Sequence, residues 1–297
     1  MSEAGEAARP AGAAPPGAGP DPSRFLSGTL GSPGGRRGRI ARRLADRALD
    51  ARLARAGRRL DALAAQPPER DVLVLSVYRG GGGLLPAAIG ELRGTRHRLA
   101  LALGSMGHAA PALAPHTAAT GLSGGKFENL NALLAGTEPA DWTLVVDDDV
   151  ALPQRFLDRM IGVCEHFDLA LAQPAQSLAS HAAWPVTRRR RGSLLRETRF
   201  VEIGPVTIFR RNALDALTPF PPLRFGWGLD VHWAALAEEH GWRLGIVDAL
   251  PVRHEQAGVA GTYSSLEAIA EARRFLAERP FLDADAVGTT VRSHPLG

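Results

Sequence analysis

Short apolar runs rich in β-branched residues alternate with amphipathic segments along residues 71–280. The runs are typical of buried strands, and the segments between them have the period of helices. The predicted strands cover 71–78, 97–105, 141–149, 168–175 and 241–248, and a further strand followed by a helix lies within 199–217. The other predicted helices cover 84–94, 124–137, 153–167, 230–241 and 264–280. Strands that alternate with helices predict an α/β fold with a mostly parallel sheet flanked by helices.

Two of these helices carry recognisable start signals. Pro153 suits the first turn of its helix, because the N–H that proline lacks would have no partner there. Ser264 or Ser265 can cap the last helix, and Glu267 falls in its first turn.

The N-terminal part of the chain follows a different pattern. Residues 1–35 are rich in Gly, Pro and Ala and have few large apolar groups, so we expect them to be disordered. Residues 36–66 place leucines at roughly helical spacing among arginines, which predicts a basic amphipathic helix that ends before Pro67 and Pro68. Residues 71–297 are expected to form the globular domain.

The basic character of the chain is concentrated in that helix. The whole chain has a net charge of +4, but residues 36–60 contain ten arginines and two aspartates, a net +8 that leaves −4 for the rest. The helix can pack on the domain or form a short coiled coil, or it can rest on anionic lipid. Packing is the favoured reading, and nucleic acid is not expected as a partner.

Several features bear on the compartment. Cys164 is the only cysteine, which excludes an intramolecular disulfide. No apolar run approaches the roughly 18–20 residues that span a bilayer, and the N-terminus has no apolar signal core. We therefore expect a cytoplasmic protein, with peripheral membrane contact through residues 36–66 left open.

Three consecutive carboxylates, Asp147, Asp148 and Asp149, follow a predicted buried strand. In open α/β sheets, ligands bind at the carboxyl ends of the strands. Two aspartates separated by one residue can direct hard oxygen ligands to one Mn²⁺ or Mg²⁺ ion, which would also remove their mutual repulsion. The alternative is a solvated acidic turn that caps the helix beginning at Pro153.

Two later segments add candidate chemistry. Trp227 lies between two glycines in the segment RFGWGLDVHW, and Asp230 follows it. The indole offers a flat face for a sugar or a base, while Asp230 can act as a general base on a hydroxyl, cap the next helix, or do both. His254 follows a strand and can be a third metal ligand or a structural histidine.

Taken in order, these segments resemble the glycosyltransferases of the GT-A fold, particularly the family 2-like group, over roughly residues 71–256. The resemblance is carried by the segments GGKFENLNALLAG, DWTLVVDDDVALP, GPVTIFRRNAL, GWGLD and VRH. It implies transfer of a sugar from a nucleotide-diphosphate donor to a hydroxyl of a glycan, lipid or small-molecule acceptor, with inversion. The chain has no QxxRW motif and no membrane span, which argues against a processive polysaccharide synthase.

The resemblance also implies roles for individual residues. Asp147 and Asp149 match the first and last acids of the DxD motif, and with His254 they would bind Mn²⁺ or Mg²⁺. Asp230 matches the catalytic base. The residues implied to lie near the donor are Ser76, Tyr78, Arg79, Lys126, Asn131, Asp147, Asp148 and Trp227.

Other readings stay open. A sugar nucleotidyltransferase shares the sheet and a carboxylate-bound metal, and the segment YRGGGG superficially offers its glycine-rich loop. A non-catalytic scaffold of the same fold is a further alternative. A Rossmann dehydrogenase is not supported, because RGGGG is not GxGxxG. No acid follows the second predicted strand, which leaves the nucleotide base open. The run 188–191, four arginines, is expected to form a solvated loop, or else to bind a phosphate or carboxylate of the acceptor.

Overall fold

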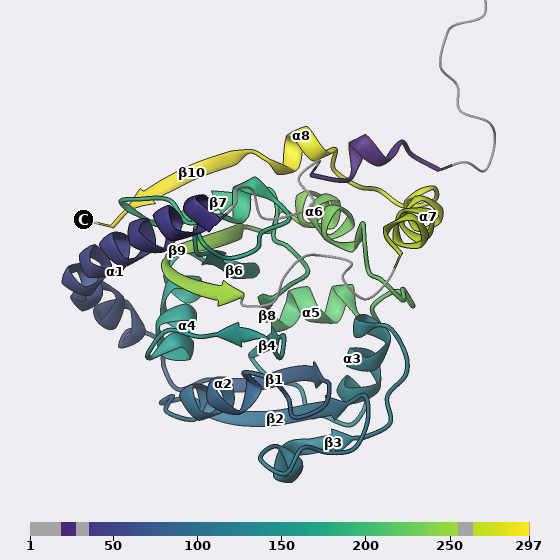
Figure 1. Ribbon diagram of the computed structural model, residues 1–297, viewed down its shortest axis with the longest axis horizontal. Helices are drawn as coiled ribbons and strands as arrows, with labels where there is room; N and C mark the ends of the chain where they lie inside the picture. Colours follow the sequence, from purple (N-terminus) through teal and green to yellow (C-terminus); the bar gives the residue numbers. More distant parts are fainter. Residues whose placement is uncertain (1–18, 28–35, 255–263, 297) are drawn as a thin grey trace, which may run out of the picture.

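The computed structural model describes residues 19–27, 36–254 and 264–296 (Figure 1). Most of the segment expected to be disordered, residues 1–18 and 28–35, lies outside the described residues.

The main sheet is largely parallel, as the sequence predicts. Its strands are β1 (Asp71–Tyr78), β2 (Arg98–Ser105), β3 (Thr117–Ala119), β4 (Trp142–Val146), β6 (Leu171–Gln176), β7 (Ser193–Thr198), β8 (Val206–Arg210), β9 (Leu244–His254) and β10 (Thr290–Pro295). They lie in the order β10-β7-β9-β6-β8-β4-β1-β2-β3, and β5 (Val150–Ala151) pairs with β9 beside this path. Strands β7 and β8 are antiparallel to their neighbours and β5 is antiparallel to β9, while the other strands share one direction.

Helices cover both faces of this sheet. They are α1 (Arg36–Ala64), α2 (Leu85–Leu92), α3 (Lys126–Leu134), α4 (Phe156–His166), α5 (Arg211–Leu217), α6 (Leu229–Glu239), α7 (Ser265–Leu276) and α8 (Ala284–Val287). Side chains of β1 alternate between the two faces: Val72 and Val74 pack with α1, α2 and α4, while Leu73 and Leu75 pack with α3, α5, α6 and α7. Both faces of the central strands are therefore buried, which explains their continuous apolar runs.

Some element boundaries differ from those expected. Helix α4 begins at Phe156 and not at Pro153, because Arg155 before it has a left-handed backbone, with φ 56°. Gly228, with φ 84°, is the N-cap of α6, so Asp230 lies inside the first turn and is not the cap. The Ser264 hydroxyl accepts the N–H of Glu267 and caps α7 as predicted. Strands β3, β7 and β10 were not expected from the sequence pattern.

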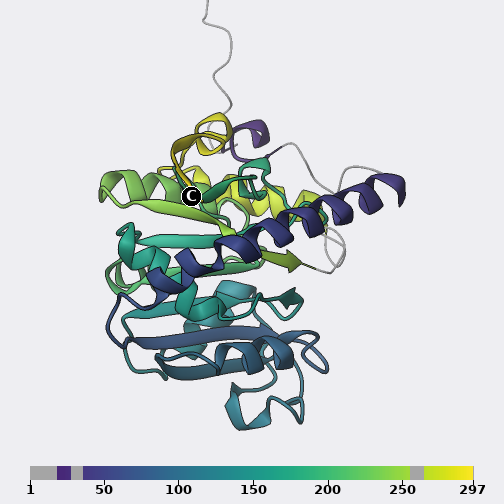
Figure 2. The ribbon, with the colours of Figure 1, turned by 90° about the vertical axis from the view of Figure 1, so that its left-hand side faces the viewer.

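Helix α1 is confirmed as a helix, and its C-terminal half packs on the domain. Leu60 and Leu63 are buried against α4. A Cβ on Gly162 of α4 would lie 2.6 Å from the carbonyl oxygen of Leu63, so this close approach requires glycine. The N-terminal end of the helix projects past the rest of the molecule, and Ile40 and Leu44 are 51% and 58% exposed (Figure 2). Across the described residues, no helix combines the length and apolarity needed to cross a membrane.

The run of four arginines differs from the solvated loop expected. Arg189 is buried and donates to Asp46 and Asp50 of α1 over 3.2 and 2.7 Å. Arg188 donates to the carbonyl oxygens of Leu178 and Ser180. Half of the run therefore anchors α1 and its own loop. Arg190 and Arg191 are exposed.

The short segment 19–27 is also packed, in contrast to the disorder expected for residues 1–35. It contains the 3₁₀ turn η1 (Pro22–Arg24), which lies beside α8 at the end of the molecule opposite β3 (Figures 1 and 2). Phe25 is 1% exposed, and Arg24 forms an ion pair of 2.8 Å with Asp283. Burial of one large aromatic side chain holds this otherwise polar segment in place.

Candidate active site

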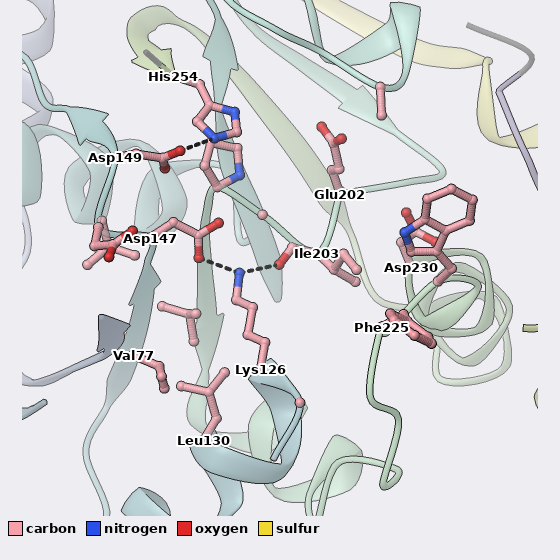
Figure 3. Close-up of a pocket in the computed structure, with 18 of the residues that line it drawn as sticks. Val77, Lys126, Leu130, Asp147, Asp149, Glu202, Ile203, Phe225, Asp230 and His254 are labelled. Carbon is pink, nitrogen blue, oxygen red and sulfur yellow. Dashed lines mark hydrogen bonds and ion pairs between the residues drawn. The ribbon is translucent and has the colours of Figure 1, made fainter. Parts of the chain in front are cut away.

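A cavity of about 780 Å³ lies at the carboxyl ends of β1, β4, β6 and β9 (Figure 3). This is the edge at which open α/β sheets bind ligands, and the volume is within the range of small-molecule sites. Of the residues predicted to be functional, the cavity is lined by Arg79, Lys126, Asp147, Asp148, Asp149, Trp227, Asp230 and His254. The structure thus gathers eight predicted residues from five separate parts of the chain.

Lys126 is held at the centre of the cavity by its helix and two polar contacts. Its Nζ lies 2.6 Å from a carboxylate oxygen of Asp147 and donates to the carbonyl oxygen of Ile203 over 3.0 Å (Figure 3). Lys126 is the first residue of α3, and the N-cap Gly125 has no room for a Cβ, which would lie 2.3 Å from the carbonyl oxygen of Leu223. The tight glycine turn therefore places the lysine against the acidic strand end.

Asp148 ties the loop after β1 to the end of β4. Its Oδ2 accepts the N–H of Arg79 over 3.0 Å, and its carbonyl oxygen accepts the N–H of Leu84 over 2.7 Å. Burial raises the pKa of the Asp148 carboxyl, against the opposing effect of the Arg79 N–H. A solvated acidic turn is therefore not what the structure shows: Asp148 positions the loop that carries Arg79.

Asp149 and His254 meet through strand pairing. Val150 of β5 lies opposite His254 of β9 in an antiparallel register, which brings Asp149 Oδ2 to 2.8 Å from His254 Nε2. Burial lowers the pKa of His254, but the hydrogen bond to Asp149 and the charges of Asp149 and Asp147 outweigh it, so the net shift is upward. A carboxylate and an imidazole thus face the cavity together.

This donor set fits part of a divalent-metal site. Among residues 19–27, 36–254 and 264–296, no three acidic, histidine or cysteine side chains stand close enough to hold an ion alone. Asp149 and His254 offer one oxygen and one nitrogen ligand, while Asp147 is paired with Lys126. Mg²⁺ and Mn²⁺ commonly take a few protein ligands and complete their shell with substrate phosphates and water.

Asp230 lies across the cavity with a second carboxylate near it. Its Oδ2 accepts the indole N–H of Trp184 over 3.2 Å, and its Oδ1 accepts the N–H of Val231 over 2.9 Å. Burial raises the pKa of Asp230 to about 7. Burial, and then the charge of Asp230, raise the pKa of Glu202 to about 8. A carboxylate with a pKa near 7 is suited to general base catalysis at neutral pH.

Three residues expected near the donor lie outside the cavity wall. Ser76 is fully buried in β1. The hydroxyl of Tyr78 lies 2.7 Å from that of Thr117. The side-chain amide of Asn131 donates to the carbonyl oxygen of Phe220 and accepts its N–H, both over 2.8 Å. Tyr78 and Asn131 thus bond to groups within the protein, and contact of all three residues with a donor stays a prediction.

The cavity also contains residues that sequence reasoning missed, namely Gln176, His181, Trp184 and Glu202. Glu202 precedes β8, whose first residue Val206 pairs with the last residue of β4, Val146. The start of this antiparallel strand therefore lies at the same edge as the carboxyl ends of its neighbours. Sequence reasoning that looks for polar residues after strands misses Glu202, because Glu202 precedes its strand.

The chain is similar to solved structures, but no protein-family model matches it and a search of curated sequences finds no relative. Similar solved structures include S. aureus TarS 1–349 in complex with UDP-GlcNAc, with a TM-score of 0.49 and 12% identity over 69% of this chain and 65% of that one. A further TarS 1–349 structure has a TM-score of 0.40 and 10% identity over 63% of this chain and 59% of that one.

GalNAc-T7 with UDP, GalNAc and Mn²⁺ has a TM-score of 0.45 and 10% identity over 63% of this chain and 43% of that one. The chain thus spans less than two thirds of each of these structures. With TM-scores below 0.5, these likenesses do not establish the activity of this chain.

Proposed function

We propose that this chain is a glycosyltransferase of the GT-A fold, family 2-like, that moves a sugar from a nucleotide-diphosphate donor to an acceptor hydroxyl. The observation that carries the proposal is the single cavity that contains Lys126, Asp149, Asp230 and His254. Lys126 is a cation, and Asp149 and His254 are potential metal ligands; together they suit a diphosphate. Asp230 is a buried carboxylate that can accept a proton. Transfer is proposed to be non-processive, with inversion at the anomeric carbon.

The reaction would be a single displacement. The acceptor oxygen forms a bond to the anomeric carbon as the bond from that carbon to the diphosphate oxygen breaks. The proton of the acceptor hydroxyl passes to Asp230, and the nucleotide diphosphate leaves with the electron pair. Lys126 and Arg79, which line the cavity, would bind the diphosphate as its negative charge grows.

The cofactor of this reaction would be Mn²⁺ or Mg²⁺, held by Asp149 and His254, with Asp147 close by. When bound, the ion supplies Lewis-acid neutralisation of the leaving diphosphate. The positions of Asp148 and Trp227 in the cavity wall support roles in shaping the donor site. Asp148 would do so through the Arg79 loop, and Trp227 by contact with the sugar or the base.

The experiment that tests this function is calorimetric titration with UDP, GDP, TDP and CMP, each with and without Mn²⁺. We expect one nucleotide to bind in a metal-dependent manner, and Asp149→Ala to abolish that binding. Asp215→Ala is the matched control, because Asp215 lies on α5 with a side chain 63% exposed and outside the cavity wall. The function is wrong if no nucleotide binds, or if Asp149→Ala binds as well as the control.

Two alternatives are separated by their products. A sugar nucleotidyltransferase would release pyrophosphate from a nucleoside triphosphate and a sugar phosphate. A non-catalytic scaffold would bind nucleotide sugar without releasing nucleotide diphosphate. Assaying both products with the nucleotide found by calorimetry therefore decides among the three.

The N-terminal half of α1 is proposed as a peripheral contact with anionic membrane. Ile40 and Leu44 are one helical turn apart, so they lie on the same side of the helix, and both are exposed. The surrounding sequence is rich in arginine, as the net charge of +8 over residues 36–60 shows. Exposed apolar side chains within a basic helix are typical of helices that lie on anionic lipid.

A further inference from the structure

One wall of the cavity contains buried polar atoms that have no hydrogen-bond partner among residues 19–27, 36–254 and 264–296. They are Oε1 of Gln176, both ring nitrogens of His181, and Oε2 of Glu202. Gln176 is 1% exposed and His181 is 6% exposed. An unpaired buried polar group destabilises the folded state, and such groups are rare in folded proteins. Three such residues around one cavity indicate that a polar ligand supplies the missing hydrogen bonds.

The position of this wall relates it to the acceptor side of the reaction. Gln176 ends β6, His181 lies in the loop that follows, and Glu202 lies just before β8. Figure 3 shows Glu202 between His254 and Asp230. The ring centroids of His181 and His254 lie 6.1 Å apart. The unpaired groups therefore lie beside the metal-ligand pair and the proposed base.

Polar groups on the donor side of the cavity have partners within the protein. Lys126 is paired with Asp147, and Arg79 donates its backbone N–H to Asp148. These contacts belong to the end of β4 and the loop after β1, where the donor diphosphate is proposed to bind. The unpaired atoms of Gln176, His181 and Glu202 are thus available for a second molecule.

We propose that Gln176, His181 and Glu202 form an acceptor subsite for a neutral, polyhydroxylated ligand, that is, a carbohydrate. This proposal rests on the proposed function and names the acceptor class of the same site. The Gln176 oxygen can accept one O–H, and His181 offers one donor and one acceptor. Sugar hydroxyls both donate and accept, so two or three neighbouring hydroxyls satisfy every unpaired atom.

Other acceptor classes fit this wall less well. An alkyl chain would leave these atoms of Gln176, His181 and Glu202 without partners, which is unfavourable. A phosphate or carboxylate at this wall would lie close to Glu202 and Asp230. The arginines that line the cavity, Arg79 and Arg224, lie on the loop after β1 and beside Gly125, on the side proposed for the donor. Sites that hydrogen-bond substrate hydroxyls discriminate strongly against analogues that lack them, because their polar groups are then left unpaired.

The test uses the full chain and defined probes. Saturation-transfer NMR would measure binding of methyl α-D-glucopyranoside, methyl α-D-mannopyranoside, methyl β-D-galactopyranoside and methyl N-acetyl-β-D-glucosaminide. Glucose 6-phosphate and decanol represent the anionic and alkyl classes. We expect at least one glycoside to bind, and Gln176→Met and His181→Phe each to weaken that binding by about 5- to 100-fold.

His97→Phe is the matched control. His97 is 6% exposed like His181 and also has an unpaired ring nitrogen, Nε2, but it does not line the cavity. We expect this variant to bind the glycoside as the wild type does. Calorimetric nucleotide binding, measured on the same three variants, reports whether the donor side is intact.

The outcomes separate the two proposals. The acceptor subsite is wrong if a chain that binds nucleotide binds no glycoside, if glycoside binding survives both substitutions, or if only glucose 6-phosphate or decanol binds. If glycoside binding is lost in the two variants but kept in His97→Phe while no nucleotide binds, the subsite stands and the transferase function fails.

Discussion

Nε2 of His254 lies 2.8 Å from Oδ2 of Asp149, although 105 positions separate the two residues in the sequence. The contact follows from the antiparallel pairing of Val150 with His254, which brings the end of β9 against the turn after β4. The register of the two strands therefore fixes the distance between the two side chains in the folded protein. Such preorganisation favours binding of a third group, such as a cation.

Replacing His254 with glutamine should weaken metal-dependent nucleotide binding. The amide keeps a hydrogen-bonding group near Asp149 but removes the imidazole ligand. Since loss of even an outer-shell partner typically costs 10- to 100-fold in metal affinity, we expect a loss of at least about tenfold. Mn²⁺ titration in the presence of nucleotide, followed by electron paramagnetic resonance of the free ion, measures this. His108→Gln, at an exposed position outside the cavity wall, should leave the titration unchanged.

Asp230→Asn should lower transfer by about 10²- to 10⁴-fold, the usual contribution of a positioned base, while nucleotide binding is retained. Because burial raises the pKa of Asp230 to about 7, the wild-type rate should increase as the pH rises through about 7, where the carboxyl loses its proton. Initial rates between pH 5.5 and 8.5 would show this. An Asn variant that transfers sugar at the wild-type rate would remove Asp230 from the mechanism.

The same carboxyl should make the fold less stable at high pH. Its pKa is about 7 in the folded protein against an ordinary value of 3.8, so the folded state holds a proton that the unfolded state has lost. Stability therefore falls as the pH rises from about 4 to about 7. Asp230→Asn removes this term, so its melting temperature relative to wild type should increase between pH 4.5 and 8.5. A difference that stays constant with pH would contradict the prediction, and Asp215→Asn should show no such trend.

Much of the fold could be predicted because the strands at the centre of the sheet are apolar throughout. Strand β7 could not, since it contains Arg196 and Glu197. Arg196 is nevertheless fully buried, because Nε lies 2.8 Å from a carboxylate oxygen of Asp248, 52 residues away. The pattern of neighbouring residues in the sequence does not reveal an ion-pair partner that lies 52 positions away.

The candidate site was predicted in part for a similar reason. Asp149 follows β4 and His254 ends β9, where the local sequence marks the edge of the sheet, whereas Glu202 reaches the same edge ahead of an antiparallel strand. Tyr78 and Asn131 occupy positions that the resemblance implied for the donor, but their polar groups are used by Thr117 and Phe220. Which way a side chain points at a strand end or on a helix depends on tertiary packing.

Two glycines in the loop after β1 should respond differently to substitution by alanine. Gly80 and Gly83 have φ of +52° and +53°, so alanine at either position costs about 1–2 kcal/mol of backbone strain. At Gly80 a Cβ meets no atom within 4 Å, but at Gly83 it would lie 2.5 Å from the carbonyl oxygen of Asp148. Gly83→Ala should therefore also displace Asp148 and weaken nucleotide binding.

Urea unfolding and calorimetry on both glycine variants measure the two effects. We expect Gly83→Ala to lose at least as much stability as Gly80→Ala. Only Gly83→Ala should lose nucleotide affinity. Equal nucleotide affinities would show that the contact between Gly83 and Asp148 has no influence on the donor site.

The exposed half of α1 provides the last prediction. Ile40→Ser combined with Leu44→Ser should reduce flotation of the full chain with vesicles that contain phosphatidylserine by about tenfold or more, because two apolar side chains no longer enter the lipid interface. Binding to pure phosphatidylcholine vesicles should be weaker throughout, since each arginine near an anionic surface contributes about 1 kcal/mol. Leu266→Ser is the matched control: Leu266 lies on α7 and is 77% exposed, so its loss removes a similar apolar surface elsewhere. Equal flotation of the wild type and the double variant would mean that the exposed side chains of α1 do not contact anionic membrane.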